Sequence, residues 1–224
     1  MEFDINDGKG NIIISYYCND KLLLFEGEYI NGEKNGKGKK YDYYSGKLLF
    51  EGEYLNGQKN GKGKEYYDNG KLLFDREYLN GQKNGKGKEY YNNGILKYEG
   101  EYLNGERNGK GKEYYTNGDL KFEGEYLNGK RWNGKGYNKE GKINFEIRKG
   151  NGKGKEYYDN GKLEFEGEYL NGEKWNGILY NKRGEIDFII RKGIAKENKF
   201  FCASELEFDG EYLIGKRNTN CQII

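Results

Sequence analysis

Paired carboxylates are the first residues in this sequence that could do chemistry. Glu51 and Glu53 lie one residue apart, a spacing at which two carboxyl groups could share general acid and general base work. The same Glu-x-Glu pair returns in almost every repeat, whereas a catalytic pair is placed once. The sequence also has no histidine, the usual general base near neutral pH. The glutamates therefore indicate a solvated column of charge, which we expect to pair with Lys62 and Lys64 across a sheet.

Two glycine-containing motifs are equally weak as sites. Gly61-Lys62-Gly63 suggests a phosphate loop, but no Gly-Lys-Ser or Gly-Lys-Thr follows it and no strand-to-helix context exists. Asp68-Asn69-Gly70 resembles the start of a calcium loop but lacks its length and its final glutamate. No serine or threonine stands in a nucleophile motif. We predict that the chain is not an enzyme and holds no cofactor and no metal.

Few aliphatic and many aromatic residues indicate an unusual core. Apolar residues are 34% of the chain, below the roughly 45–50% of ordinary globular proteins. Aromatic residues reach 16% and there are 37 glycines, so we expect rings that pack on bare backbone. The net charge of +2 gives little electrostatic drive toward nucleic acid, which we do not expect as a partner.

The chain shows no signal for membrane insertion or export. Met1–Gly10 is polar and acidic, unlike a signal peptide, and aliphatic runs such as Ile12–Ile14 are far below the ~20 residues that span a bilayer. Cys18, Cys202 and Cys221 are odd in number and form no Cys-x-x-Cys, which predicts reduced thiols. These features predict a cytoplasmic protein, which could still bind membranes peripherally.

A repeat covers nearly the whole chain. The string Phe-Glu-Gly-Glu-Tyr-Leu-Asn-Gly begins at Phe50 and returns with small changes at intervals of roughly 20 to 25 residues. We predict a single repeat array over 1–224 with about ten hairpin units. Its parts are a cap-like unit over 1–24, regular units over 25–144, alternating short and regular units over 145–215, and a tail over 216–224. The first aromatic residues of the units are Phe3, Phe25, Phe50, Phe74, Tyr98, Phe122, Phe145, Phe165, Phe188 and Phe208.

Each unit has the pattern of a β-hairpin. From Phe50 to Leu55, aromatic or glycine positions alternate with Glu51, Glu53 and Leu55, the period of two that is typical of a strand. The segment 56–60 has turn residues, and a second strand is expected from about Gly61 to Tyr67. Proline is absent. The sequence predicts an all-β fold, an elongated single-layer twisted antiparallel sheet of tandem hairpins.

Glycines on alternate strand positions have an expected packing role. Gly61 and Gly63 are predicted to leave slots into which Phe50 and Tyr54 fit from the neighbouring strand. Arg76 replaces the glycine at one such slot, so we expect the aromatic face to be plugged there.

The unit resembles the MORN repeat (membrane occupation and recognition nexus). The resemblance rests on Tyr98–Gly105 and the following Gly109-Lys110-Gly111, and it extends over residues 3–215. Asparagine stands where the family usually has histidine before Gly-x-Gly, and tyrosine replaces its first-strand tryptophan, which is typical of a variant. The resemblance implies an extended antiparallel sheet with a role in lipid contact, protein scaffolding or self-association.

The aromatic face is the first candidate binding surface. A single-layer sheet leaves both faces open unless something covers them. Rings at equivalent positions would form a groove for a protein partner or a dimer, unless they are used in packing on the glycines and on one another. The candidate residues are Phe50, Tyr54, Phe74, Tyr78, Tyr98, Tyr102, Phe122 and Tyr126.

A basic turn edge is the second candidate. One lysine or arginine per hairpin occupies an equivalent turn position, with a spacing of about 10 Å that suits a row of lipid headgroups. The two tryptophans lie beside these residues, where they would anchor at a membrane interface or fold over the neighbouring hairpin. The alternative is a solvated edge that opposes aggregation. The candidate residues are Lys34, Lys59, Lys83, Arg107, Arg131, Trp132, Lys174 and Trp175.

We expect a non-enzymatic scaffold that mediates protein–protein interaction. The alternatives are peripheral binding to acidic phospholipids or phosphoinositides and a self-associating structural element. A protein is therefore the expected partner, and an acidic membrane surface and a homodimer remain open.

Overall fold

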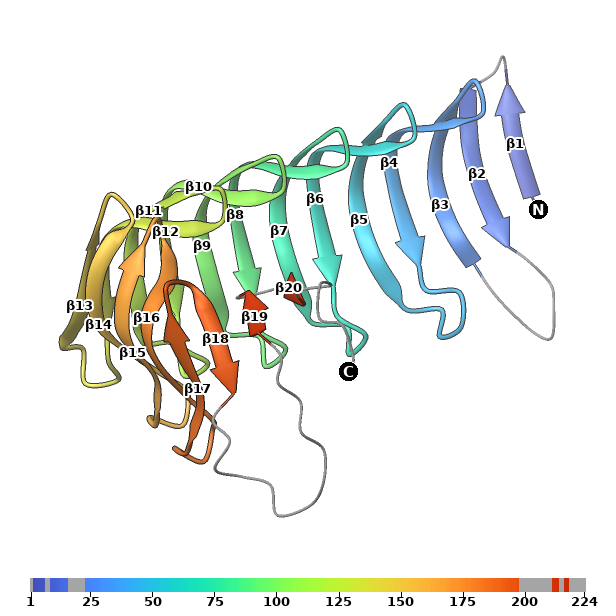
Figure 1. The fold of residues 1–224 in the computed structure, drawn as a ribbon. Helices are drawn as coiled ribbons and strands as arrows, with labels where there is room; N and C mark the ends of the chain where they lie inside the picture. Colours follow the sequence, from blue (N-terminus) through green and yellow to red (C-terminus); the bar gives the residue numbers. More distant parts are fainter. Residues whose placement is uncertain (1, 7–8, 16–22, 198–210, 214–215, 218–224) are drawn as a thin grey trace, which may run out of the picture. The chain divides into compact units, whose positions relative to one another are not determined.

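All regular structure in the described part of the chain is β. The computed structural model describes residues 2–6, 9–15, 23–197, 211–213 and 216–217 (Figure 1). The chain divides into two compact units, Met1–Gly118 and Asp119–Ile224, called unit 1 and unit 2 below. The three cysteines lie outside the described residues, as does the predicted tail from residue 218 onward.

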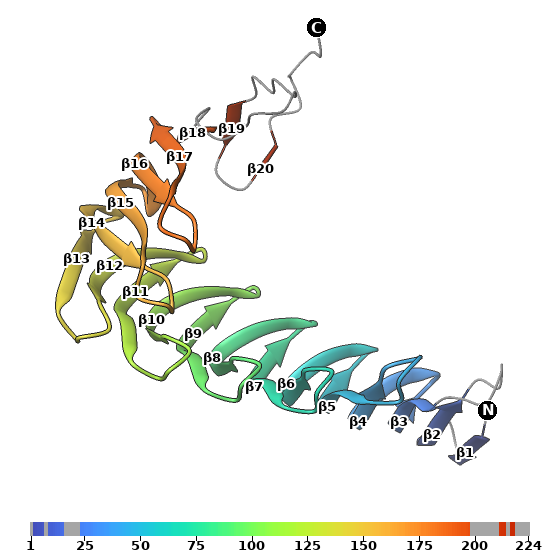
Figure 2. The ribbon, with the colours of Figure 1, turned by 90° about the horizontal axis from the view of Figure 1, so that it is seen from below.

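Unit 1 is an open antiparallel sheet whose strands pair in sequence order, each with the one before and the one after it (Figures 1 and 2). Its strands are β1 (Glu2–Asn6), β2 (Lys9–Ser15), β3 (Leu23–Ile30), β4 (Glu33–Tyr41), β5 (Leu48–Leu55), β6 (Gln58–Tyr66), β7 (Leu72–Leu79), β8 (Gln82–Tyr90), β9 (Leu96–Leu103) and β10 (Glu106–Tyr114).

Unit 2 repeats this topology with shorter hairpins. The predicted fold class, an all-β antiparallel sheet of tandem hairpins, is confirmed within each unit. The strands of unit 2 are β11 (Leu120–Leu127), β12 (Lys130–Tyr137), β13 (Ile143–Arg148), β14 (Asn151–Tyr157), β15 (Leu163–Leu170), β16 (Glu173–Tyr180), β17 (Ile186–Arg191), β18 (Ile194–Glu197), β19 (Glu211–Leu213) and β20 (Lys216–Arg217).

The hairpin turns are tighter than the sequence predicts. Asn56 and Gly57 have φ of 48° and 77°, and Leu55 pairs with Gln58, so the loop has only two residues. Positive φ at both loop positions suits Asn-Gly and matches the twist of the flanking strands. Strand β6 consequently begins at Gln58, three residues before the predicted start, and Lys59 belongs to the strand.

A β-bulge follows the turn in most hairpins, whereas β13–β14 and β17–β18 pair without one. Tyr54 pairs with Lys59 but Gly52 pairs with Gly63, so the single residue between them on β5 faces a longer stretch of β6. Gly61 lies in this stretch with φ of 75°, and a Cβ there would meet the Glu53 carboxylate at 2.3 Å. The prediction that Gly61 forms a slot for an aromatic ring is therefore wrong, because the bulge turns it toward the opposite face.

Gly63 does form the predicted slot. A Cβ at this position would lie 2.5 Å from Cζ of Phe50, so the ring packs on bare backbone. Phe50 meets Tyr54 edge to face at a centroid distance of 5.4 Å, and it meets Tyr78 of the next hairpin at 5.5 Å. The same ring pairs return from hairpin to hairpin in unit 1. The core of the described sheet is thus a column of interlocked rings.

Arg76 does not plug the aromatic face. Phe74 and Tyr78, its neighbours on the strand, are buried and keep their edge-to-face contact at 5.5 Å. Arg76 itself is exposed and has φ of 141°, in a region that glycine adopts freely and arginine does not. The ring column therefore continues past Arg76.

Candidate binding surface

The aromatic face is closed. The side of the sheet that carries Phe50 and Tyr54 is called the inner face below. All eight rings predicted to bind a partner are at most 6% exposed, so they form the core and no open aromatic groove. A binding role for these residues stays a prediction. The rings are Phe50, Tyr54, Phe74, Tyr78, Tyr98, Tyr102, Phe122 and Tyr126.

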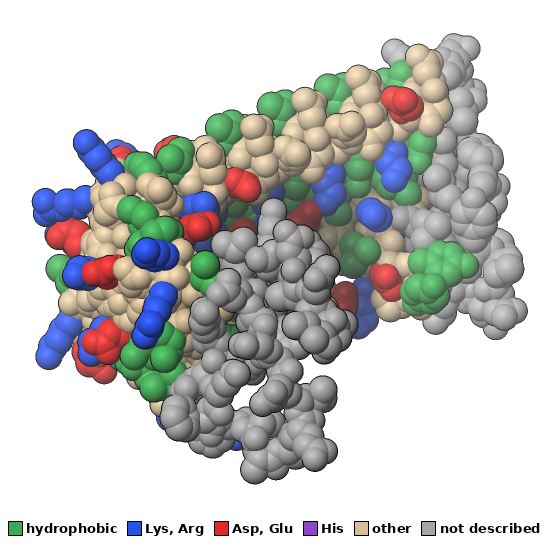
Figure 3. Space-filling view, viewed as in Figure 1, with side chains coloured by type: hydrophobic (Ala, Val, Ile, Leu, Met, Phe, Trp, Pro, Cys, Tyr) green, Lys and Arg blue, Asp and Glu red, His purple; other side chains and the backbone are tan. Residues whose placement is uncertain are grey.

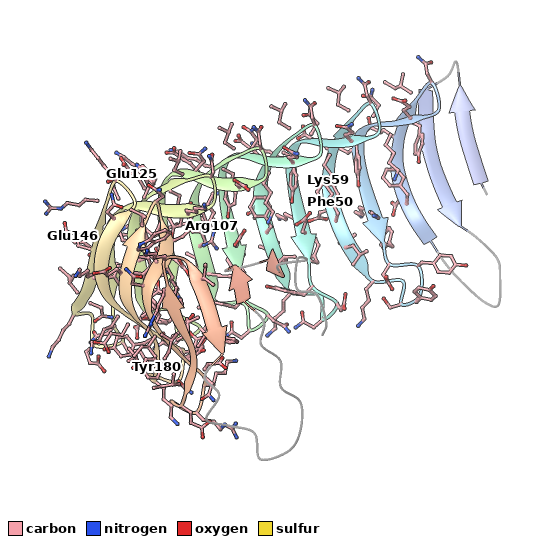
Figure 4. The ribbon with its side chains drawn as sticks, in the orientation of Figure 1. Phe50, Lys59, Arg107, Glu125, Glu146 and Tyr180 are labelled. Carbon is pink, nitrogen blue, oxygen red and sulfur yellow. The ribbon has the colours of Figure 1, made fainter. Side chains whose placement is uncertain are left out.

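Lysine and arginine side chains cover the rings. Lys59, directly across the ladder from Tyr54, must point to the same inner face. Its Nζ lies 4.4 Å from the centroid of Phe50 and 2.5 Å from Oε1 of Glu65 (Figure 4). The ammonium group therefore combines a cation–π contact with an ion pair, while its stem shields the ring.

The sequence predicts six lysines and arginines at the turn edge, and this predicted position is wrong. Each stacks over a ring of the inner face, with distances to the nearest centroid between 4.0 and 4.9 Å. The cause is the two-residue turn, which leaves Asn-Gly at the tip and places the cation at the first inward strand position. Lipid binding through these residues stays a prediction. The residues are Lys34, Lys59, Lys83, Arg107, Arg131 and Lys174.

Glutamates hold most of these cations in place. Glu89 forms two ion pairs, one from Oε1 to Nζ of Lys83 at 3.3 Å and one from Oε2 to the guanidinium group of Arg107 at 2.8 Å. In unit 2, Glu156 lies between Arg131 and Lys174, with 3.0 Å to the Nζ of Lys174. Burial raises the pKa of Glu156, but the two cations outweigh it and bring the pKa to about 2. These carboxylates are structural counter-ions in the described sheet.

Both tryptophans fold over a neighbouring hairpin. Trp132 is the extra residue of a bulge, since Tyr126 pairs with Arg131 and Glu125 with Asn133. A Cβ at Gly150, in the next turn, would lie 2.6 Å from the Trp132 ring. Trp175 has the same relation to Gly193. Both indoles are half-buried, so packing accounts for much of their surface. Their role as membrane anchors stays a prediction.

Asparagines beside the tryptophans join consecutive hairpins. Asn133 donates from Nδ2 to Glu125 at 2.6 Å and accepts from the backbone N–H of Lys149 at 2.7 Å. Asn176 makes the same two contacts, with Glu168 at 2.9 Å and Lys192 at 2.9 Å. Asparagine at this position therefore connects neighbouring hairpins. The sequence showed that asparagine replaces the usual histidine of the repeat, but it did not indicate these contacts.

The opposite side of the sheet, called the outer face below, carries rows of alternating charge. Glu51 lies between Lys39 and Lys64 in the ladder, and Lys64 also pairs with Asp75. The predicted cross-strand pairing is confirmed for Glu51 and Lys64, whose charged atoms lie 3.9 Å apart. Glu53 pairs with Lys37 of the preceding hairpin and not with Lys62, because of the bulge.

A groove of about 660 Å³ runs over the outer face of unit 1. The glycines of β3 to β6 contribute backbone to its floor, and the charged rows form its walls. The lining residues are Glu26, Gly27, Glu28, Lys37, Gly38, Lys39, Glu51, Gly52, Glu53, Lys62, Gly63, Lys64 and Asp75.

A row of exposed leucines borders this face at the turn ends of the hairpins. Leu55, Leu79 and Leu103 are the last residues of their strands and are 45%, 50% and 49% exposed. They form the leucine row, and Figure 3 shows hydrophobic side chains following the turn ends of unit 1. Two cavities, of about 410 and 470 Å³, open beside Leu55 and Leu103. This row was not predicted from the sequence, although one leucine precedes Asn-Gly in each of these hairpins.

Fold and surfaces together define a tandem β-hairpin repeat protein with a ring core and two unlike faces. The family model of the MORN repeat matches residues 25–43, 50–71 and 98–120, and that of the MORN repeat variant matches 83–104 and 151–171. The chain therefore carries MORN repeats, including variant ones, as the sequence predicts. A comparison with curated proteins finds no match.

A membrane-spanning helix and a metal-binding cluster are both missing from the part of the chain that the structure describes. It contains no helix that is long and apolar enough to cross a membrane. It also contains no group of three or more cysteine, aspartate or glutamate side chains arranged to hold a metal ion.

Proposed function

We propose that the chain is a non-enzymatic scaffold that binds a protein partner on the outer face of unit 1. The leucine row carries this proposal. Apolar side chains that are about half exposed and repeat at equal intervals are typical of partner surfaces. The glycine-floored groove beside them offers backbone to a close-packed partner, and its walls supply both signs of charge.

The spacing of the row favours an amphipathic α-helix as the partner. Successive hairpins place their leucines roughly 10 Å apart, since each hairpin adds two strands to the sheet. Seven residues of α-helix rise by about the same distance. A helix with one apolar residue per heptad could therefore meet Leu55, Leu79 and Leu103 in turn. Its charged residues would then face the alternating glutamates and lysines of the outer face.

Affinity capture with chemical cross-linking tests this proposal. We expect the triple variant Leu55→Ser, Leu79→Ser and Leu103→Ser to lose partners that the wild type retains, with cross-links from those partners to Lys62 and Lys86. The matched control is Ile143→Ser with Ile186→Ser, which removes exposed apolar side chains from unit 2. Identical partners for all three proteins, or cross-links confined to unit 2, would contradict the proposal.

The same variants distinguish the two alternative functions. Salt-sensitive flotation with acidic vesicles, equal for wild type and the triple leucine variant, would favour lipid binding instead. A mass that rises with protein concentration and falls in the leucine variant would favour self-association through the row.

A further inference from the structure

Hairpin β3–β4 lacks a carboxylate that the following hairpins of unit 1 possess. In β5–β6, Glu65 lies across the ladder from Phe50 and from Phe74, and holds the stacked Lys59. Glu89 takes the same place beside Lys83. The corresponding ladder position in β3–β4, across from Phe25 and Phe50, is occupied by Lys40. Hairpin β3–β4 therefore has two cations where the two hairpins after it have an ion pair.

Lys34 is the stacked cation of this hairpin. Its Nζ lies 4.3 Å from the centroid of Phe25 and 5.6 Å from that of Tyr54. Lys34 is half-buried and Lys40 is exposed. Burial and the charge of Lys40 both lower the pKa of Lys34, as expected for a cation without a counter-ion. Among the described residues, Lys34 and Lys40 form no ion pair.

A hydroxyl group completes the cluster. The OH of Tyr54 is buried and has no hydrogen-bond partner among the described residues. Burial raises the pKa of Tyr54 to about 12, so the hydroxyl keeps its proton and remains a donor. In the next hairpin, burial and the charge of Glu65 both raise the pKa of the equivalent Tyr78, whose OH likewise has no hydrogen-bond partner among the described residues.

We propose that Lys34, Lys40 and Tyr54 bind a small oxyanion, a carboxylate or phosphate group, in the place that Glu65 occupies one hairpin further on. The two ammonium groups supply charge, the hydroxyl donates a hydrogen bond, and the exposure of Lys40 leaves the position open to solvent. This site lies on the inner face and is independent of the protein-binding function proposed above.

Thermal unfolding in inorganic phosphate, exchanged for chloride at constant ionic strength and pH 7, tests the site. We expect the unfolding temperature of the wild type to rise by several degrees with phosphate concentration, because the ligand binds only the folded chain. The rise should level off once the site is filled. Lys40→Glu supplies the missing carboxylate, so this variant should start at a higher midpoint and lose the response. Lys142→Glu, an equal charge change at an exposed position in unit 2, should respond like the wild type.

A second variant keeps the test independent of overall charge. Tyr54→Phe retains the ring and removes the donor, so the phosphate concentration at half-response should rise severalfold while the unliganded fold persists by circular dichroism. A response retained in Lys40→Glu, or lost equally in Lys142→Glu, would overturn the proposal and indicate an adventitious ion only. The proposal would also be overturned if neither phosphate nor acetate raised the unfolding temperature of the wild type.

A flotation experiment with lipid vesicles distinguishes a lipid headgroup from a soluble anion as the ligand. Flotation with phosphatidylinositol 4-phosphate vesicles that requires Lys40 would assign the phosphate to a lipid headgroup. A response to free phosphate or acetate without flotation would assign the site to a soluble ligand.

Discussion

The first ring of each regular hairpin in unit 1 is covered from two directions. Gly63 lies beneath Phe50, and the stem of Lys59 lies over it. Burying a phenylalanine ring stabilises the fold by about 1.5–3 kcal/mol, and a stacked cation adds roughly 0.5–1 kcal/mol. A chain with few aliphatic residues can thus form a core, provided that the glycine and the cation both stay in place.

Adding a methyl group at the slot should be costly. We expect Gly63→Ala to lower the free energy of unfolding by about 3 kcal/mol, because its Cβ would lie 2.5 Å from the Phe50 ring. Gly57→Ala is the control, since no atom lies within 4 Å of that Cβ and only its positive φ costs about 1 kcal/mol. Urea denaturation compares the two, and equal losses would contradict the packing described for the ring.

The ion pairs of Glu156 predict a pH dependence. The pKa of this carboxyl is about 2, below its ordinary value of 4.5, so the pairs stabilise the fold above pH 4.5 and lose this effect as the pH falls toward 2. We expect Glu156→Gln to be less stable than the wild type by about 3 kcal/mol at pH 7, with a difference that narrows between pH 4.5 and 2. Denaturant titrations over this range measure it. A difference that stays constant with pH would show that charge is not its cause.

At the scale of the hairpin, the bulge decides which side chains reach which face. The two-residue turn and the bulge after it place Lys59 on the inner face, and they turn Gly61 toward Glu53. In unit 2, the bulged residue is a tryptophan, which reaches the next turn at Gly150. The bulge therefore links neighbouring hairpins by side-chain packing in addition to the ladder.

Removing the bulged indole should weaken unit 2. We expect Trp132→Ala to lower the free energy of unfolding by about 2 kcal/mol, less than for a fully buried tryptophan because the ring is half-buried. Leu127→Ala, at an exposed position on the adjacent strand, should change it by less than about 0.5 kcal/mol. Urea denaturation again distinguishes them. A tryptophan variant as stable as the leucine variant would mean that the indole packs on nothing.

The hairpins could be predicted from the sequence, but their inner detail could not. The alternation from Phe50 to Leu55 is local, so the strand, its facing and the Gly63 slot followed from it. Asn56-Gly57 is a local signal for a two-residue turn, but the bulge depends on how residues 58–62 pair with β5, which no short motif specifies. The position of Lys59 and the exposure of Leu55 both depend on that register, and they were therefore the features missed.

At the scale of the whole molecule, each strand of unit 1 pairs only with the strands before and after it. Stability in such arrays is roughly a sum over units and their interfaces. Because each hairpin contacts only its neighbours, hairpin β3–β4 can have Lys40 where the next hairpins have a glutamate, and the ring column still continues through it.

Removing one complete hairpin should leave the others intact. Deletion of residues 72–95 takes out β7, β8 and the following connection, and joins Lys71 to Leu96 in the sequence order of the other units. We expect the variant to keep its β-sheet circular dichroism and to unfold with a smaller denaturant dependence, since less surface is buried. Loss of the sheet signal would show that interactions beyond nearest neighbours hold the array.

Hydroxyl-radical footprinting of the free protein tests most directly the claim that the rings are core and the leucine row is the open surface. We predict fast labelling of Leu55, Leu79 and Leu103. We also predict that Tyr54 and Tyr78 react far more slowly than Tyr44, which is 82% exposed. Inner-face tyrosines that label as fast as Tyr44, with protected leucines, would contradict this claim.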